Sequence, residues 1–132
     1  MLTGIQVLCF DLDNTFWDLW PVMARAEAAV DAWLRAHHPR IAQRCSIDVL
    51  REARQALARA EPALAHDVTA LRIESLARLA RELGESPEIG VHAFEVFLAV
   101  RNQVVLYDDV RPALQALGRR FRLATFSNGN AD

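Results

Sequence analysis

The stretch Ile5-Gln6-Val7-Leu8-Cys9-Phe10-Asp11-Leu12-Asp13-Asn14-Thr15 is a short apolar run that ends in two carboxylates one residue apart. Its length and its β-branched and aromatic side chains predict a strand buried on both faces of a parallel sheet. Open parallel sheets bind ligands just beyond the carboxyl ends of their strands. The sequence therefore places Asp11 and Asp13 where a functional site is expected.

The spacing of the two carboxylates indicates a division of roles. Side chains at i and i+2 point the same way, so both would face one pocket, where one stays charged and the other keeps a proton more easily. That division suits a nucleophile and a general acid/base. Attack on a phosphate would also need a hard cation such as Mg²⁺ beside Asp11. On these residues alone, a helix cap or a turn is the favoured interpretation.

Two motifs carry a resemblance to a known family. Phe10-Asp11-Leu12-Asp13-Asn14-Thr15 resembles the first signature motif of the haloacid dehalogenase (HAD) superfamily, a hydrophobic run followed by D-x-D-x-T. Leu123-Ala124-Thr125-Phe126-Ser127-Asn128-Gly129-Asn130 resembles the second motif, a strand that ends in Ser or Thr followed by Asn. The resemblance implies an α/β fold, with a partial Rossmann-like parallel-sheet core and an inserted four-helix cap.

Helical periodicity fills the segment between the two motifs. It predicts helices over 21–37, over 46–61, over 67–83 and from residue 86 onward. The expected signals at the helix ends are Pro21 at a first helical position, Pro39 just past an end, Ser46 as an N-cap and Gly84 as a C′ residue. The apolar stripe expected in the fourth helix consists of Val91, Phe94, Phe97 and Leu98.

The chain then returns to the core. Asp109 is expected to cap a short helix with Pro112 in its first turn, and residues 121–126 are expected to form a second strand beside the first. The resemblance then divides the chain into a core, residues 1–15 and 110–132, and a cap, residues 16–109. Caps in this superfamily close over the site and select the substrate. A helical bundle that merely packs on the sheet is the alternative.

The resemblance also implies roles for individual residues. Asp11 resembles the nucleophile that forms an aspartyl phosphate, and Asp13 the acid that protonates the leaving group and later activates water. The Asp11 side chain and the Asp13 backbone carbonyl would be ligands of Mg²⁺, and Ser127 and Asn128 would bind phosphate. Dehalogenases of this superfamily usually lack an acid at the position of Asp13, so a phosphatase is favoured.

Within the superfamily, the sequence is similar to cytosolic phosphatases that act on flavin mononucleotide and on the phosphoribitylaminouracil intermediate of riboflavin synthesis. The similarity rests on residues 20–27, 60–69 and 127–131. It implies a small-molecule phosphate ester as substrate. His66, Asp67 and Arg72 would form a polar cluster at a cap tip that faces this substrate. In the alternative, Asp67 caps the third helix and His66 packs or faces water.

Composition narrows the remaining possibilities. The 132 residues are 52% hydrophobic and carry a net charge of −2, which indicates a globular chain without a basic patch for nucleic acid or a membrane anchor. No signal sequence or spanning segment is expected, so a cytoplasmic location is predicted. Cys9 and Cys45 are expected to be unrelated thiols, with Cys9 in the core. Two further groups have simple interpretations: Arg51, Arg54 and Arg59 as solvated surface, and Trp17, Trp20 and Trp33 as packing residues.

Two superfamily motifs have no counterpart in this sequence. The third supplies a Lys or Arg and the fourth an acidic pair, both normally after the second motif, and the sequence contains no Lys. We therefore expect the front part of a phosphatase, inactive by itself and able to self-associate through an incomplete sheet. The alternative is a catalytically silent fragment that acts as a binding or assembly module.

Overall fold

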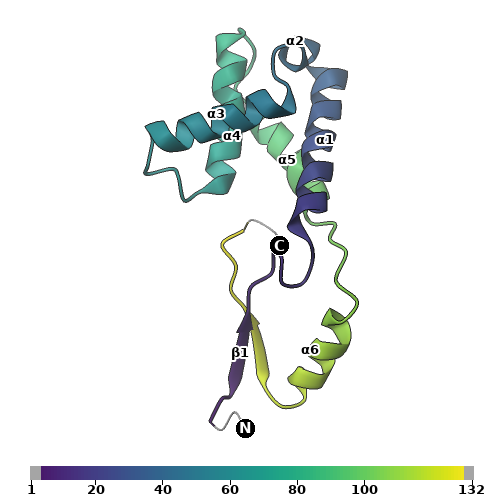
Figure 1. Cartoon of the computed structure of the whole chain (residues 1–132). Coiled ribbons are helices and arrows are strands. Elements are labelled where there is room, and N and C mark those ends of the chain that lie inside the picture. Colours follow the sequence, from purple (N-terminus) through teal and green to yellow (C-terminus); the bar gives the residue numbers. More distant parts are fainter. Residues whose placement is uncertain (1–3, 130–132) are drawn as a thin grey trace.

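The computed structural model describes residues 4–129 and has two ends (Figure 1). One end holds a sheet and one helix, and the other holds a group of helices. The sheet end consists of β1 (Val7–Phe10), β2 (Arg122–Thr125) and α6 (Val110–Gly118). The helical end consists of α1 (Leu19–His37), α2 (Pro39–Ala42), α3 (Ile47–Ala60), α4 (Val68–Glu82) and α5 (Ile89–Arg101). The predicted α/β class is confirmed.

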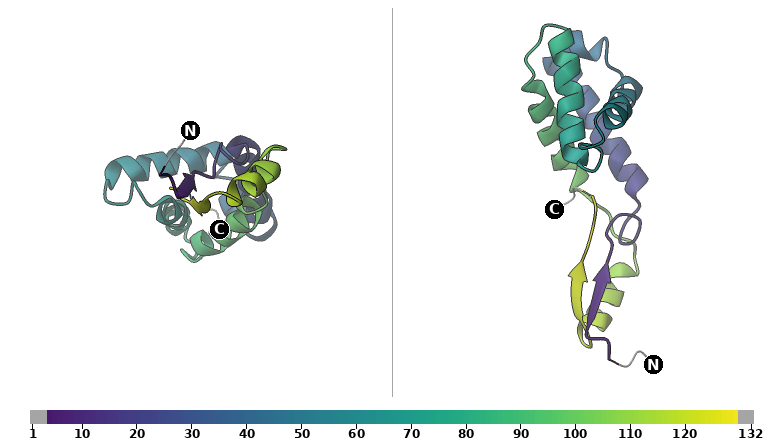
Figure 2. Two further views of the ribbon diagram at one scale, coloured as in Figure 1. Left: turned by 90° about the horizontal axis from the view of Figure 1, so that it is seen from below. Right: turned by 90° about the vertical axis from the view of Figure 1, so that its left-hand side faces the viewer.

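The two strands pair in parallel, with Val7 opposite Arg122 and Phe10 opposite Thr125. Both carboxyl ends therefore point toward the helical end of the molecule. In the right-hand view of Figure 2, α6 lies behind the strands and their other face is open. Val7 is 50% exposed and Cys9 is also exposed, so the prediction of a strand buried on both faces is wrong for the described residues. The reason is that β1 has one neighbouring strand and one covering helix.

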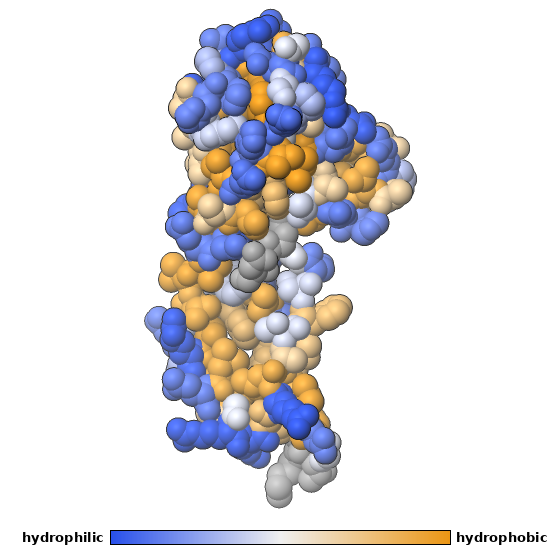
Figure 3. Space-filling model, turned by 180° about the vertical axis from the view of Figure 1, so that it is seen from behind, coloured by the Kyte–Doolittle hydropathy of each residue, from blue (hydrophilic) through white to orange (hydrophobic). Residues whose placement is uncertain are grey.

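The sheet end presents an apolar surface (Figure 3). Its exposed side chains include Ile5, Val7, Leu123 and Phe126, the last of which is 79% exposed. Such apolar side chains are typical of a sheet that packs against further elements or another chain.

Local capping explains most helix ends. The Asp18 side chain accepts a hydrogen bond from the backbone N–H of Trp20, so α1 begins at Leu19 and Pro21 is its third residue, not its first. Pro39, expected just past a helix, instead begins α2. The short α2 was not predicted because four residues give no period.

Other predicted ends are confirmed. The Ser46 and Asp67 side chains cap α3 and α4. Gly84 has a φ of +71°, and the Glu85 N–H donates to the Ala80 carbonyl oxygen at 2.8 Å, which closes α4 with a Schellman motif. Asp109 precedes α6 in a helical backbone conformation and its side chain makes no capping hydrogen bond, so that prediction is wrong.

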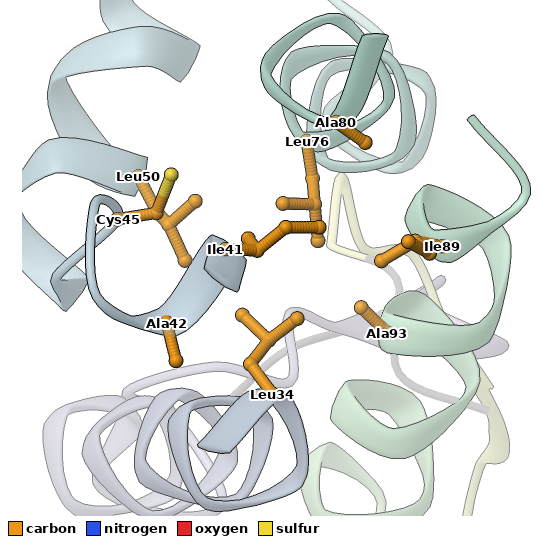
Figure 4. Packing of buried hydrophobic residues seen from close by; sticks show 9 residues of the cluster. All are labelled: Leu34, Ile41, Ala42, Cys45, Leu50, Leu76, Ala80, Ile89 and Ala93. Atoms are coloured by element: carbon orange, nitrogen blue, oxygen red, sulfur yellow. The ribbon is translucent and has the colours of Figure 1, made fainter. Parts of the chain in front are cut away.

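The hydrophobic core lies in the helical end (Figure 4). Its buried members are Leu34, Ile41, Ala42, Cys45, Leu50, Leu76, Ala80, Ile89 and Ala93. The predicted apolar stripe of α5 is confirmed at Phe97, which is buried, and is wrong at Val91, which is 45% exposed; Ile89 and Ala93 are the other buried apolar side chains of this helix face. A Cβ on Gly90 would lie 2.3 Å from the Ile73 carbonyl oxygen, so α4 and α5 approach closely at this glycine.

Two connecting segments join the helical end to the sheet end. The Tyr107 N–H donates to the Phe16 carbonyl oxygen at 2.9 Å, which ties the segments together. Trp17 is 6% exposed here, as expected of a packing residue, and Trp33 packs against the core. Trp20 is 74% exposed, so the packing prediction is wrong for it. Within residues 4–129, every helix is too short or too polar to cross a lipid bilayer.

Candidate active site

The loop after β1 turns back on itself and fixes Asp13. The N–H groups of Thr15 and Phe16 both donate to the Leu12 carbonyl oxygen, and Asn14 adopts a φ of +61°. This turn brings Trp17 beside Asp13, whose Oδ1 accepts a hydrogen bond from the Trp17 indole Nε1 at 2.9 Å. The carboxylate is therefore oriented by a residue four positions along the chain.

A second partner of Asp13 comes from α5, the last helix of the helical group in the sequence. Arg101, in the last turn of α5, places its Nη2 2.6 Å from both Oδ1 and Oδ2 of Asp13. Its side chain is 2% exposed, against 18% for the Asp13 side chain. Its Nη1 is also buried, and the described residues offer it no hydrogen-bond partner. A buried donor without an acceptor is costly, which marks this atom as a place where a ligand oxygen fits.

The loop after β2 closes over the same carboxylate. The Gly129 N–H donates to the Ser127 Oγ at 3.1 Å. A Cβ on Gly129 would lie 2.7 Å from Asp13 Oδ2 and 3.4 Å from both Arg101 Nη2 and Ser127 Oγ. Only glycine permits this approach. The structure thus brings Asp13, Arg101 and Ser127 together at the carboxyl ends of the two strands.

Asn128, between Ser127 and Gly129, is exposed and makes no hydrogen bond or ion pair within residues 4–129. Asn130 and Ala131, which complete the motif stretch, lie outside the described residues, as do the ends of the predicted core at 1–3 and 130–132.

Asp11 directly follows β1, and its carboxylate is exposed. Its Oδ1 accepts a hydrogen bond from the Leu12 N–H at 2.8 Å, and in the described part of the chain no hydrogen bond or ion pair joins it to Asp13 or Ser127. The side chain is free to meet a ligand from solvent. The structure therefore brings Asp13, Arg101 and the Ser127–Gly129 loop together, and leaves Asp11 at their edge.

Residues 4–129 contain no cluster of three or more acidic, His or Cys side chains that would hold a metal by themselves. The Asp11 carboxylate is an oxygen ligand of the kind that Mg²⁺ prefers. The predicted ligand from Asp13 is its backbone carbonyl, so the pairing of its side chain with Arg101 does not conflict with that prediction. These residues fit part of a Mg²⁺ site.

The predicted cap cluster does not form as a unit. His66 is exposed, and the Asp67 Oδ1 accepts from the Ala70 N–H at 2.8 Å, which is the capping role of the alternative interpretation. Arg72 instead points into the helical group, where its guanidinium lies 3.8 Å from the centroid of the Phe97 ring. Burial, with Arg54 nearby, lowers the Arg72 pKa to about 10.

A buried carboxylate organises this region. Glu27, on α1, is 8% exposed and pairs with Arg51 and Arg54 of α3 and with Arg72 of α4. The prediction of solvated surface is therefore wrong for Arg54, whereas the Arg51 side chain is 42% exposed despite its ion pair and Arg59 is exposed as expected. The signal for this network was Glu27, an acidic residue directly beside the buried Ala26 in the helix predicted over 21–37.

Sequence reasoning also missed Arg101. The signal was available, because Ile89, Ala93, Phe97 and Arg101 follow one another at four-residue spacing on the buried face of α5. A charged residue that continues a buried stripe is usually paired.

A parallel strand pair whose carboxyl-terminal loops meet beneath an inserted group of helices defines an α/β fold with a helical insertion after its first strand. Comparison with known proteins refines this class. No family model matches the chain. The 5-amino-6-(5-phospho-D-ribitylamino)uracil phosphatase YigB of Escherichia coli (strain K12) is 33% identical over 134 aligned residues, which cover 98% of this chain and 56% of that protein.

Solved structures agree. The 2-haloacid dehalogenase from Pseudomonas syringae pv. Tomato DC3000 superposes with a TM-score of 0.87 at 35% identity, over 97% of this chain and 57% of that one. The putative HAD-hydrolase YfnB from Bacillus subtilis, a structure bound to magnesium, has a TM-score of 0.60 at 19% identity, over 96% of this chain and 55% of that one. The chain is similar over nearly its whole length to proteins of the haloacid dehalogenase superfamily. It spans a little over half the length of these relatives.

Proposed function

We propose that the protein hydrolyses small-molecule phosphate monoesters with Mg²⁺, through an aspartyl phosphate on Asp11. The observation that carries this proposal is the meeting of Asp13, Arg101 and the Ser127–Gly129 loop at the carboxyl ends of β1 and β2. An acid, a cation and a glycine-containing loop at that edge form an arrangement suited to a phosphate ester. The similarity to proteins of the haloacid dehalogenase superfamily supports the same reaction class.

In the proposed reaction, an Asp11 carboxylate oxygen attacks phosphorus and the ester P–O bond breaks. Asp13 gives its proton to the departing alkoxide and then takes a proton from the water that cleaves the acyl phosphate, so its proton is restored. Mg²⁺, held by Asp11 and the Asp13 carbonyl, would offset the charge of the phosphate. Ser127 and the neighbouring N–H groups would orient the phosphate oxygens.

Asp13 cannot deliver a proton while both of its oxygens accept from Arg101. A phosphate oxygen near the unpartnered Nη1 would draw the guanidinium away from the carboxylate. We therefore assign Arg101 two partners, Asp13 in the free protein and the phosphate in the complex. This exchange makes the acid available when substrate is present.

The substrate belongs to the same proposal. YigB is named for 5-amino-6-(5-phospho-D-ribitylamino)uracil, and flavin mononucleotide is the related candidate. Residues 16–109 would act as the cap over a core of 1–15 and 110–132 and would select the leaving group. The cytoplasmic location expected from the sequence remains a prediction.

The test is Asp11→Asn in the reading frame that contains this chain. Release of phosphate from both candidate esters, with and without Mg²⁺, should fall about 1,000-fold or more because an amide cannot form the acyl phosphate. Asp108→Asn, which removes an exposed carboxylate outside the site, is the matched control and should leave turnover unchanged. Near-normal activity of Asp11→Asn would show that the nucleophile is assigned wrongly.

A further inference from the structure

A cavity lies inside the helical group, between α1, α3, α4 and α5. Its volume is about 40 Å³. One wall is polar, with Glu27, Arg54, Arg72 and Ser75, and the other is apolar, with aliphatic side chains and the rings of Phe94 and Phe97. A water molecule needs about 10–15 Å³ on this measure, so the cavity has room for a group of about three heavy atoms.

The polar wall carries more positive than negative charge. Two guanidinium groups, Arg54 and Arg72, face one carboxylate, Glu27, and their side chains are 19%, 15% and 9% exposed. Arg51 binds the same carboxylate from the outer side, where Arg51 is 42% exposed. One carboxylate shared by three guanidinium groups leaves an excess of buried positive charge. Burial and the neighbouring Arg54 depress the pKa of Arg72, as expected for such an excess.

Arg72 is the guanidinium with unused donors. Its closest approach to Glu27 joins Nη1 and Oε1 at 3.8 Å, which is an ion-pair distance and too long for a hydrogen bond. Within residues 4–129 its side chain donates no hydrogen bond to another residue, whereas Arg54 Nη2 donates to Glu27 Oε1 at 2.9 Å. A guanidinium has five N–H donors in a fork that matches an oxyanion. The Phe97 ring holds the plane of this fork in place.

We propose that this cavity is a second anion-binding site, which takes a carboxylate or a similarly small oxyanion between Arg54 and Arg72. The site is close to the candidate active site, because Phe97 on its wall lies one helical turn before Arg101, and one turn is about 5 Å. The anion is a ligand separate from the two candidate esters, because the ribityl and ring groups of those esters carry no second negative charge.

The experiment is a titration of the chain with sodium acetate, followed by NMR of the arginine Nε–H groups and of the Trp17 indole N–H. We expect saturable shifts at Arg54 and Arg72, with acetate affinity at least tenfold weaker in Arg72→Met. Arg59→Met removes an exposed arginine of the same α3 helix and should bind acetate as the wild type does. Arg72→Lys keeps the charge without the fork, and we expect an affinity between those of wild type and Arg72→Met.

The result that would overturn the proposal is the absence of saturable shifts at Arg54 and Arg72 in the wild type, or equal affinity in Arg72→Met. The wild-type titration decides the question even when a variant fails to fold, which thermal unfolding would reveal. Trp17 reports on Asp13 and not on the cavity. Loss of acetate binding therefore leaves the proposed phosphatase chemistry untouched, and inactivity of the phosphatase leaves the acetate result standing.

Discussion

Replacement of Arg101 by Met should weaken the attachment of α5 to the sheet end and alter the environment of Asp13. Arg101 is almost fully buried and is paired through Nη2 with both oxygens of Asp13 at 2.6 Å. Loss of one partner from a buried ion pair typically costs about 3–5 kcal/mol. The lower limit applies here, because the Asp13 side chain is 18% exposed and keeps its bond from Trp17.

The variant also removes a cost. Arg101 Nη1 is buried without a partner among the described residues, and a buried unsatisfied donor costs about 1–3 kcal/mol. The difference is a net loss of about 1 kcal/mol in the free energy of unfolding, since Met fills much of the same volume. With a urea dependence of about 1–3 kcal/mol/M, the unfolding midpoint should fall by about 0.5 M.

The assay is equilibrium unfolding in urea, followed by circular dichroism and by Trp17 fluorescence. Arg111→Met, which removes an exposed arginine from the first turn of α6, is the control and should shift the midpoint little. A double-mutant cycle with Asp13→Asn should show coupling between the two positions, because both variants remove the same ion pair. Additive effects, or an Arg101→Met variant as stable as the wild type, would refute the reasoning.

Three further predictions concern other parts of the molecule. Glu27→Gln should lower the free energy of unfolding by about 3 kcal/mol, since the buried Arg54 and Arg72 lose their countercharge; an unchanged urea midpoint would contradict this. Iodoacetamide should alkylate exposed Cys9 and spare Cys45 in the native chain, as read by mass spectrometry. Burial and the nearby Glu82 raise the pKa of the Cys45 thiol. The neutral thiol therefore stabilises the fold below the ordinary thiol pKa, and this stabilisation is lost as the pH rises through the raised pKa. Residues 1–132 should self-associate through the open sheet, and Val7→Lys should reduce the mass seen by light scattering; a wild-type monomer at high concentration would show that the apolar face needs no cover.

The features that sequence alone predicted are local ones. Ser46, Asp67 and Gly84 mark helix ends because the groups they satisfy lie within a few residues along the chain. Asp11, Asp13 and Ser127 were recognised because each lies within three residues of a predicted strand end, in a stretch that resembles a superfamily motif. The partners of these residues were not predicted, since Arg101 and Asp13 are 88 positions apart and no local rule joins them. The arginines around Glu27 were missed for the same reason.

The burial of β1 shows a different limit. The side chains of residues 5–10 have the composition of a strand covered on both sides, yet β1 has one neighbouring strand and is open on one face. An apolar strand sequence indicates that the strand is adapted to burial on both faces. The exposed fraction of its side chains depends instead on which strands and helices pack against it. The open apolar face is consistent with relatives that are longer than this chain.

Both partners of Asp13 belong to segments that lead into or out of the helical group. Trp17 immediately precedes α1, Arg101 ends α5, and the bond between Phe16 and Tyr107 holds the two connecting segments together. A rotation of the helices relative to the sheet would therefore move both donors of Asp13 at once. The hydrogen bonding of the proposed acid should therefore depend on the position of the helical group. Arg101→Met removes the ion pair with Asp13, which is the stronger of the two links. In that variant, motion of the helices should shift the NMR resonance of the Trp17 indole N–H without a matching shift in the resonances of the Ser127–Gly129 loop.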